Sequence, residues 1–242
     1  MDLRNVLVSD HSRDRIRDET NAFSLDANRR LEYAGLCPET LCVRPGTTAL
    51  AEHGSDPYVS WGRWTGGDVH VTGSAYVYRA PYTSNQGMHY LVGSPALGLP
   101  TQGRFSYSLV GATQPTFSDG STSPGSFAGR IGVQFAPGSA ARIGIEAQVR
   151  IGGGTYAIAT SGGVSDPSAS ELQLSSTARF EGSLRTQASG VPHTVCAGQS
   201  CTTQVRGGLF GPGGLRAGYG YTIRDPGSQR TIDGVGVFAR DP

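Results

Sequence analysis

Hydrophobic and polar residues alternate along most of this chain with the period of two that is typical of β-strands. The clearest case is SFAGRIGVQFAPGSAARIGIEAQVRI, residues 126–151, in which two alternating runs flank the turn sequence APGSA. The pattern predicts a hairpin with one buried and one wet face. We expect the buried face to hold Ile131, Val133, Phe135, Ile143, Ile145 and Val149, and the wet face to hold Arg130, Arg142, Glu146 and Arg150.

Glycine interrupts the same alternation in VRGGLFGPGGLRAGYGYTIRDPGSQRTIDGVGVFAR, residues 205–240. Ala217, Tyr219, Tyr221 and Ile223 share one face there. A dinucleotide fingerprint is absent, because Arg216 stands where G-x-G-x-x-G needs its third glycine, and a P-loop is excluded because the chain has no lysine. We therefore interpret the glycines as barrel corners and as positions covered by aromatic rings.

Strand patterns recur along the rest of the chain, separated by turn residues and without helical spacing. The fold we predict is all-β: an antiparallel meander closed into a small barrel of about eight strands with a filled interior, plus extra N-terminal strands. NAFSLDANRRLEYAGL, residues 21–36, predicts a hairpin that turns at DANR. We expect two parts, an N-terminal segment over residues 1–56 and the barrel domain over residues 57–242.

Composition narrows the choice of partners. The chain has 242 residues, a formal net charge of +1 and no concentrated arginine patch, which argues against nucleic acid. No run approaches the ~18 apolar residues of a membrane helix. MDLRNVLVSDHSRDR, residues 1–15, has no apolar signal core. We therefore expect membrane association only through an anchor or a partner.

The four cysteines form two C-x4-C pairs, CPETLC and CAGQSC. Local bridges Cys37–Cys42 and Cys196–Cys201 are the favoured interpretation, which points to an oxidising compartment. A four-thiolate zinc site usually needs C-x2-C spacing and is disfavoured. Cross-pairing between the two loops stays open, because connectivity cannot be deduced from sequence.

Several segments resemble the barrel domain of transferrin-binding-protein-B-like surface proteins of Gram-negative bacteria, in the variant found at the C-terminus of FecR-domain proteins. The likeness covers roughly residues 57–240 and includes DPYVSWGRWTGG, the V-x-G-x-L-F-G-P pattern at Val205–Pro212, and GVFAR at Gly236–Arg240. It implies an eight-stranded barrel with a filled interior, often lipid-anchored outside the cell, that binds another macromolecule. No lipobox cysteine stands near residue 1 and no handle domain is recognisable, so the fold carries over better than the ligand.

Catalytic signatures are missing. There is no G-x-S-x-G or H-E-x-x-H motif, and the five histidines lack metal-ligand spacing, although His70 and His89 could meet across neighbouring strands. We expect no cofactor, no metal and no enzyme activity; an envelope enzyme of unknown chemistry is the remote alternative. A second alternative is a membrane-embedded outer-membrane barrel, in which Arg142, Glu146 and Arg150 would line a polar lumen.

The leading hypothesis is a non-enzymatic periplasmic or cell-surface module that binds a protein or iron-carrier partner. AYVYRAPYTSNQGMHY, residues 75–90, gathers tyrosines and an arginine around turn residues, which is the composition of binding hot spots. The candidate contacts are Arg79, Tyr82, His89 and Tyr90, and we expect Arg79, Tyr82 and His89 to be exposed.

Overall fold

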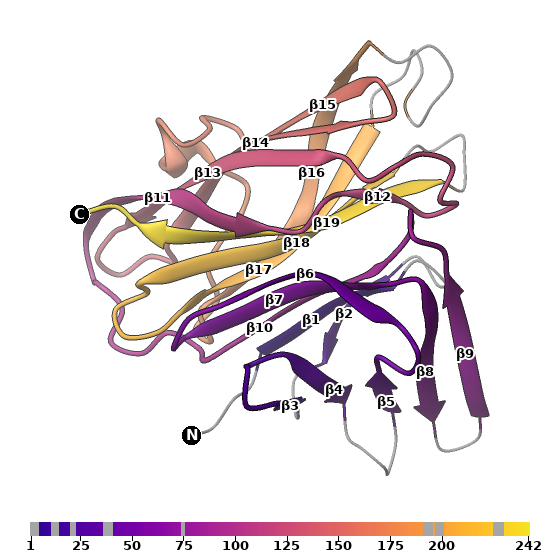
Figure 1. Cartoon of the computed structure of the whole chain (residues 1–242). Helices are drawn as coiled ribbons and strands as arrows, with labels where there is room; N and C mark the ends of the chain where they lie inside the picture. Colours follow the sequence, from indigo (N-terminus) through magenta and orange to yellow (C-terminus); the bar gives the residue numbers. More distant parts are fainter. Residues whose placement is uncertain are drawn as a thin grey trace.

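A closed β-barrel forms the C-terminal part of the computed structural model, which describes residues 5–10, 15–19, 23–35, 41–73, 76–190, 196, 201–224 and 230–242 (Figure 1). Eight antiparallel strands follow one another around it, and β11 closes the ring by pairing with β19 as well as β13. They are β11 (Gly103–Ala112), β13 (Ser126–Phe135), β14 (Arg142–Ile151), β15 (Gly154–Ala159), β16 (Arg179–Ser189), β17 (Cys201–Phe210), β18 (Arg216–Arg224) and β19 (Thr231–Arg240). The short β12 (Thr116–Phe117) also pairs with β19. The predicted all-β meander and its eight-stranded closure are confirmed.

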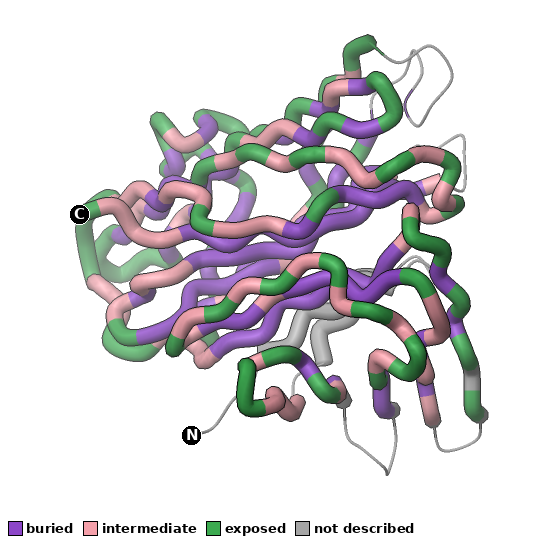
Figure 2. The backbone as a smooth tube through the Cα atoms, in the orientation of Figure 1, coloured by how far each residue is buried: buried purple, intermediate pink, exposed green. Residues whose placement is uncertain are grey.

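The predicted hairpin at residues 126–151 is β13 and β14, and its apolar face fills the barrel interior. All six predicted core residues are buried there. Arg130, Glu146 and Arg150 are exposed as expected, whereas Arg142 is only half-exposed because it donates a hydrogen bond of 2.9 Å to the Ser170 carbonyl. The interior is therefore apolar, and the charged side chains of this hairpin lie on the outer wall. Figure 2 shows buried and exposed residues intermixed along the barrel strands. This arrangement overturns the alternative in which Arg142, Glu146 and Arg150 line a polar lumen.

Aromatic rings cover two interior glycines of the last strand. A Cβ on Gly236 would lie 2.8 Å from Cε1 of Phe127, and one on Gly234 would meet the hydroxyl of Tyr221. Phe127 stacks on Tyr221, with ring centroids 5.2 Å apart. The absence of side chains at these two positions makes room for the rings, as the sequence predicted.

Two further sheets precede the barrel. The five-stranded sheet next to the barrel, called here the middle sheet, has the order β2-β1-β10-β7-β6. Its strands are β1 (Asn5–Asp10), β2 (Arg15–Glu19), β6 (Ala49–Ser55), β7 (Val59–Thr65) and β10 (Met88–Gly93). The outer sheet has the order β3-β4-β5-β8-β9 and consists of β3 (Phe23–Leu25), β4 (Leu31–Gly35), β5 (Leu41–Arg44), β8 (Gly67–Gly73) and β9 (Tyr76–Tyr82).

The three parts are layered, with the middle sheet between the outer sheet and the barrel (Figure 1). β10 shows this best, because all six of its residues are buried. Met88, Tyr90 and Val92 pack in the core shared with the outer sheet, while Leu91 packs against Phe210, Val235 and Val237 of the barrel wall. Neither face of β10 meets solvent, so its sequence lacks the alternation of a half-buried strand.

The N-terminal strands extend further along the chain than the sequence indicated. β3 and β4 form the predicted hairpin, closed by a hydrogen bond of 2.9 Å from the Asp26 amide to the Arg30 carbonyl. Residue 56, however, lies inside a second hairpin, formed by β6 and β7, and the closed barrel begins only at Gly103. Alternation identifies strands but not their sheet, which explains the difference. The division into domains at residues 1–56 and 57–242 stays a prediction.

Within the described residues, no helix has the length and apolar character needed to cross a membrane.

Candidate protein-binding surface

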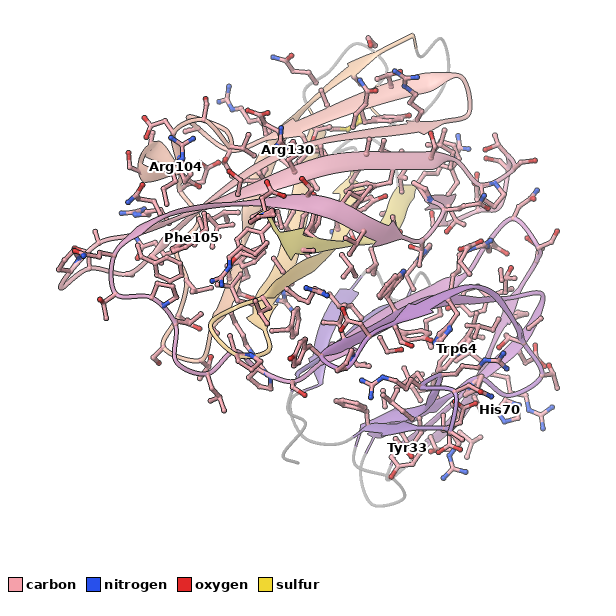
Figure 3. All side chains as sticks on the ribbon, turned by 60° about the vertical axis from the view of Figure 1, so that its left-hand side comes forward. Tyr33, Trp64, His70, Arg104, Phe105 and Arg130 are labelled. Carbon is pink, nitrogen blue, oxygen red and sulfur yellow. A yellow bond between two sulfur atoms is a disulfide. The ribbon has the colours of Figure 1, made fainter. Side chains whose placement is uncertain are left out.

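The face of the outer sheet that points away from the middle sheet carries a row of polar side chains. We call Tyr33, Arg44, His70 and Arg79 the outer row. Strand register places them side by side: Arg44 is opposite His70 in β5 and β8, and His70 is opposite Arg79 in β8 and β9. Tyr33 of β4 continues the row, with the guanidinium carbon of Arg44 5.9 Å from its ring centroid. Figure 3 labels Tyr33 and His70 on this sheet and Trp64 on the middle sheet.

The residues between them face the opposite way and explain why the row is accessible. Val43, Val71 and Ala80 are buried in the core that joins the outer and middle sheets. Because successive side chains of a strand point to opposite faces, Arg44, His70 and Arg79 are directed outward. Arg44 and Arg79 are exposed. The face therefore presents two guanidinium groups, one on each side of His70.

His70 occupies the centre of the outer row. Gly46 lies against its ring, in the left-handed conformation with φ of 58°, and a Cβ there would come within 2.8 Å of Cδ2 of His70. The Nε2 atom of His70 is buried and has no hydrogen-bond partner among the described residues. That ring nitrogen lies against Gly46 and away from solvent, so the groups that a partner can reach are the two exposed arginines.

The edge of this surface is β9; among its described side chains, Val77, Arg79 and Pro81 are exposed. Val77 is 76% exposed and gives this edge an apolar contact. Asp68 lies opposite Pro81 on the same face and offsets part of the positive charge. The arrangement combines an apolar contact and two cations, which suits recognition of another macromolecule better than chemistry on a small substrate.

Only one of the four predicted contact residues lies on this surface. Arg79 is exposed as expected, but Tyr82, His89 and Tyr90 are 6%, 0% and 0% exposed. The prediction that Tyr82 and His89 are exposed is wrong, because Tyr82 points into the core between the sheets and β10 is covered on both faces. Burial also raises the pKa of the Tyr90 phenol. These three residues are placed to support packing rather than contact.

His70 and His89 do not meet. His89 belongs to the middle sheet, where its ring nitrogens lie 2.7 Å from the Thr113 hydroxyl and 2.9 Å from the Thr116 hydroxyl. His70 belongs to the outer sheet. The sequence interpretation of neighbouring strands failed because β8 pairs with β5 and β9 but not with β10.

Sequence reasoning missed Tyr33, Arg44, His70 and Val77 as parts of one surface. Each occurs in an alternating or turn-flanked run, but only the register of β4, β5, β8 and β9 brings them together. A signal was present in LCVRPG, residues 41–46, where an arginine precedes a Pro-Gly turn at the end of a short apolar run. It could not be interpreted without knowing which strand lies next to it.

Of the predicted bridges, Cys196–Cys201 is confirmed, with Cα atoms 5.4 Å apart. This excludes cross-pairing and a four-thiolate zinc site. Cys42 is disulfide-bonded and buried, but Cys37 lies outside the described residues, so the Cys37–Cys42 pair stays a prediction. Among the described side chains, no group of three or more His, Cys, Asp or Glu residues could hold a metal ion.

A recess lies on the barrel wall. It has a volume of about 400 Å³ and lies between the segment Glu171–Ser175 and strands β16 and β17. Arg206 and Glu181 form an ion pair of 3.1 Å at its rim, and both side chains are well exposed. Mutually paired charges leave this recess less suited than the outer row to attract a partner of one sign.

The fold and this surface define a class of protein: an all-β chain in which a closed eight-stranded barrel supports a two-sheet unit with an exposed basic face. The chain is similar in structure to transferrin-binding protein B. Against a double mutant of that protein from Haemophilus parasuis Hp5, the TM-score is 0.49 at 10% identity, over 98% of this chain and 45% of the other. Against isotype 1 from serogroup B Neisseria meningitidis, the TM-score is 0.46 at 11% identity, over 99% of this chain and 44% of the other.

A mutant chain from Actinobacillus pleuropneumoniae H49 gives a TM-score of 0.43 at 13% identity, over 99% of this chain and 98% of the other. The chain spans slightly less than half the length of the first two structures. No protein-family model and no curated protein matches it.

Proposed function

We propose that this chain is a non-enzymatic binding module that works outside the cytoplasm, in the periplasm or at the cell surface, and captures a protein partner through the outer row. The observation that carries the proposal is the exposed pair Arg44 and Arg79, one on each side of His70. Arginine is enriched at binding hot spots because its planar guanidinium donates several hydrogen bonds in a fixed geometry. The face is thus suited to an acidic patch on a folded protein.

The nature of the partner follows from the sequence resemblance to transferrin-binding-protein-B-like surface proteins. An iron-carrying protein of the transferrin kind is therefore the partner to test first. The Cys196–Cys201 bridge supports an oxidising compartment, which is where such a partner would be met. The relation to FecR-domain proteins and attachment through a lipid anchor remain parts of this proposal.

The test measures binding of purified, iron-loaded transferrin to the immobilised chain by surface plasmon resonance. The double variant Arg44→Ala, Arg79→Ala should weaken capture by about tenfold or more, because it removes both cations from the face. The matched control is Arg130→Ala, Arg150→Ala, which removes two exposed arginines from the barrel wall and should bind normally.

Equal binding by both double variants would overturn the assignment of the surface. If the unmodified chain does not bind transferrin, the iron-carrier part of the proposal is wrong. The partner would then be sought by pull-down from the native medium and mass spectrometry, with the same two double variants as the comparison.

A further inference from the structure

The free edge of the outer sheet has a defined set of unused backbone groups. β9 is the last strand of its sheet, and in the described part of the chain no strand pairs with its far side (Figure 1). Its register with β8 is continuous from Gly67 opposite Tyr82 to Gly73 opposite Tyr76. One edge of β9 is therefore paired with β8 along its whole length, and the backbone groups of the other edge could pair with a further strand.

Pro81 determines which groups point to the open side. The Asp68 amide donates a hydrogen bond of 2.9 Å to the Thr47 hydroxyl, and the Asp68 carbonyl accepts one of 3.0 Å from the Thr47 amide. Both backbone groups of Asp68 therefore point away from Pro81, which has no N–H, and the two residues form a non-hydrogen-bonded pair. The direction of the backbone N–H and C=O groups alternates from one residue to the next along a strand. The backbone groups of Arg79 and Val77 therefore point to the same side of β9 as those of Pro81. The open edge thus offers the N–H and C=O groups of Val77 and Arg79, and the C=O of Pro81.

The side chains of Val77, Arg79 and Pro81 determine which sequence a strand added to the open edge of β9 would need. Val77, Arg79 and Pro81 all lie on the outer face, and Arg79 is next to His70 in the outer row. A strand added in antiparallel orientation would place one side chain directly opposite Arg79 and another opposite Val77. An acidic residue complements the first position and an apolar β-branched residue complements the second.

We propose that β9 binds an extended strand of a protein partner by adding it to the outer sheet, and that this strand carries the pattern acidic-x-apolar. The order follows from geometry, since an antiparallel strand meets Arg79 before Val77. Pro81, which cannot donate a hydrogen bond, limits the paired stretch to about five residues, or roughly 17 Å of extended chain. The inference deepens the proposed function, on which it rests, by giving that surface a binding mode and a sequence preference.

The test uses a capped nine-residue peptide, TTTETVTTT, and ¹⁵N-labelled chain. In the free chain the amide protons of Val77 and Arg79 should exchange rapidly with solvent, and they should become protected when the peptide is added. Replacing the glutamate of the peptide with lysine should weaken binding by about tenfold or more. Methylating the backbone nitrogen of that glutamate should abolish binding, because it removes a ladder hydrogen bond without changing the charge.

Two variants of the chain separate the backbone from the side chain. Val77→Pro removes an N–H that β8 does not use, so it should keep the thermal unfolding temperature yet lose peptide binding. Val77→Thr keeps that N–H but loses part of the apolar contact, so it should bind the peptide more weakly than the unmodified chain and more tightly than Val77→Pro. Peptide binding that survives both Val77→Pro and N-methylation would overturn strand addition, as would protection of amides elsewhere instead of those at Val77 and Arg79.

The outcomes distinguish this inference from the function on which it rests. If Arg44→Ala, Arg79→Ala reduces transferrin capture while no peptide protects the β9 amides, the surface binds through side chains and strand addition is wrong. If Val77→Pro instead changes the sedimentation coefficient of the chain on its own, the edge pairs with a second copy, and the partner-strand proposal is wrong.

Discussion

Three tyrosines buried in the barrel differ in whether their hydroxyl group has a hydrogen-bond partner. The Tyr107 hydroxyl donates a hydrogen bond of 2.8 Å to the Gly214 carbonyl, whereas those of Tyr219 and Tyr221 have no partner among the described residues. Tyr107→Phe should lower the free energy of unfolding by about 1–2 kcal/mol, because it leaves a buried carbonyl unpaired. Tyr219→Phe should leave that free energy unchanged or raise it. Denaturant unfolding of the two variants measures both effects.

The same phenols make the protein sensitive to alkali. Burial raises the pKa of Tyr107 to about 12, against the opposing effect of nearby Arg240, and burial also raises the pKa values of Tyr219 and Tyr221. A tyrosine with a raised pKa binds its proton more tightly in the folded state, so its contribution to stability is complete below pH 10 and is lost as the pH rises through 12. The chain has ten tyrosines, so the share of Tyr107 in the tyrosinate absorbance near 295 nm is the difference between the chain and its Tyr107→Phe variant. That difference should appear together with loss of the β-sheet circular dichroism signal. A difference that already appears at pH 10 in folded protein would contradict this.

Phe135 and Arg130 test the two faces of β13. Phe135 is 6% exposed and its ring lies edge-on to that of Phe105, with centroids 5.8 Å apart. Phe135→Ala should lower the free energy of unfolding by about 3–5 kcal/mol through loss of buried surface and a remaining cavity. Arg130→Ala, on the solvent side, should cost roughly 0.5 kcal/mol or less. Similar costs for both variants would mean that the face assignment is wrong.

At the scale of an element, the Cys196–Cys201 bridge closes a short loop immediately before β17. Both cysteines are buried in the barrel core. Replacing both with serine should lower the free energy of unfolding by about 2 kcal/mol from loop entropy, plus the cost of burying two hydroxyls. Non-reducing peptide mapping checks the pairing directly, and four free thiols in natively exported protein would contradict it.

The sequence predicted the core and surface residues of a strand only where one face of that strand is exposed to solvent. In β13 and β14 apolar and polar residues alternate, so the hairpin, its core residues and its solvent face all followed from the sequence. β10 is buried on both sides, and MHYLVG gives no sign of which face meets the barrel. His89 and Tyr90 were therefore misplaced. The outer row depended on register between strands distant in sequence, which no local pattern encodes.

Substitution of two glycines on the outer side of β18 can test whether the middle sheet packs directly on the barrel. A Cβ on Gly218 would lie 2.9 Å from Cδ2 of Leu91 in the middle sheet, whereas one on Gly220 would have no atom nearer than 3.9 Å. Gly218→Ala should push the middle sheet from the barrel wall and cost about 1–3 kcal/mol. Gly220→Ala should be neutral or stabilising by up to roughly 1 kcal/mol. Equal effects in a denaturant titration would contradict direct packing at Leu91.

An ion pair joins the same two parts. Nε of Arg216 on β18 lies 2.5 Å from a carboxylate oxygen of Asp56, in the turn between β6 and β7. Both side chains are partly buried, so the pair fixes the orientation of the middle sheet on the barrel in addition to the apolar contacts. The outer row is thus carried by a unit whose position is set by the barrel, as expected for a scaffold that presents a binding face.

The closure of the barrel sets the order in which the chain can fold. The strands of both N-terminal sheets, including β10, the partner of β1, are complete once residue 93 has been synthesised. Both sheets can therefore form while the rest of the chain is still being made. Tyr107, in contrast, is paired with Arg240, and the ring cannot close before that last strand has emerged. Chains elongate at about 5–20 residues per second, so the edge of β11 that will meet β19 stays open for several seconds, while its other edge pairs with β13. During that interval the open edge is prone to aggregation, and a chaperone that covers it should raise the yield of native protein.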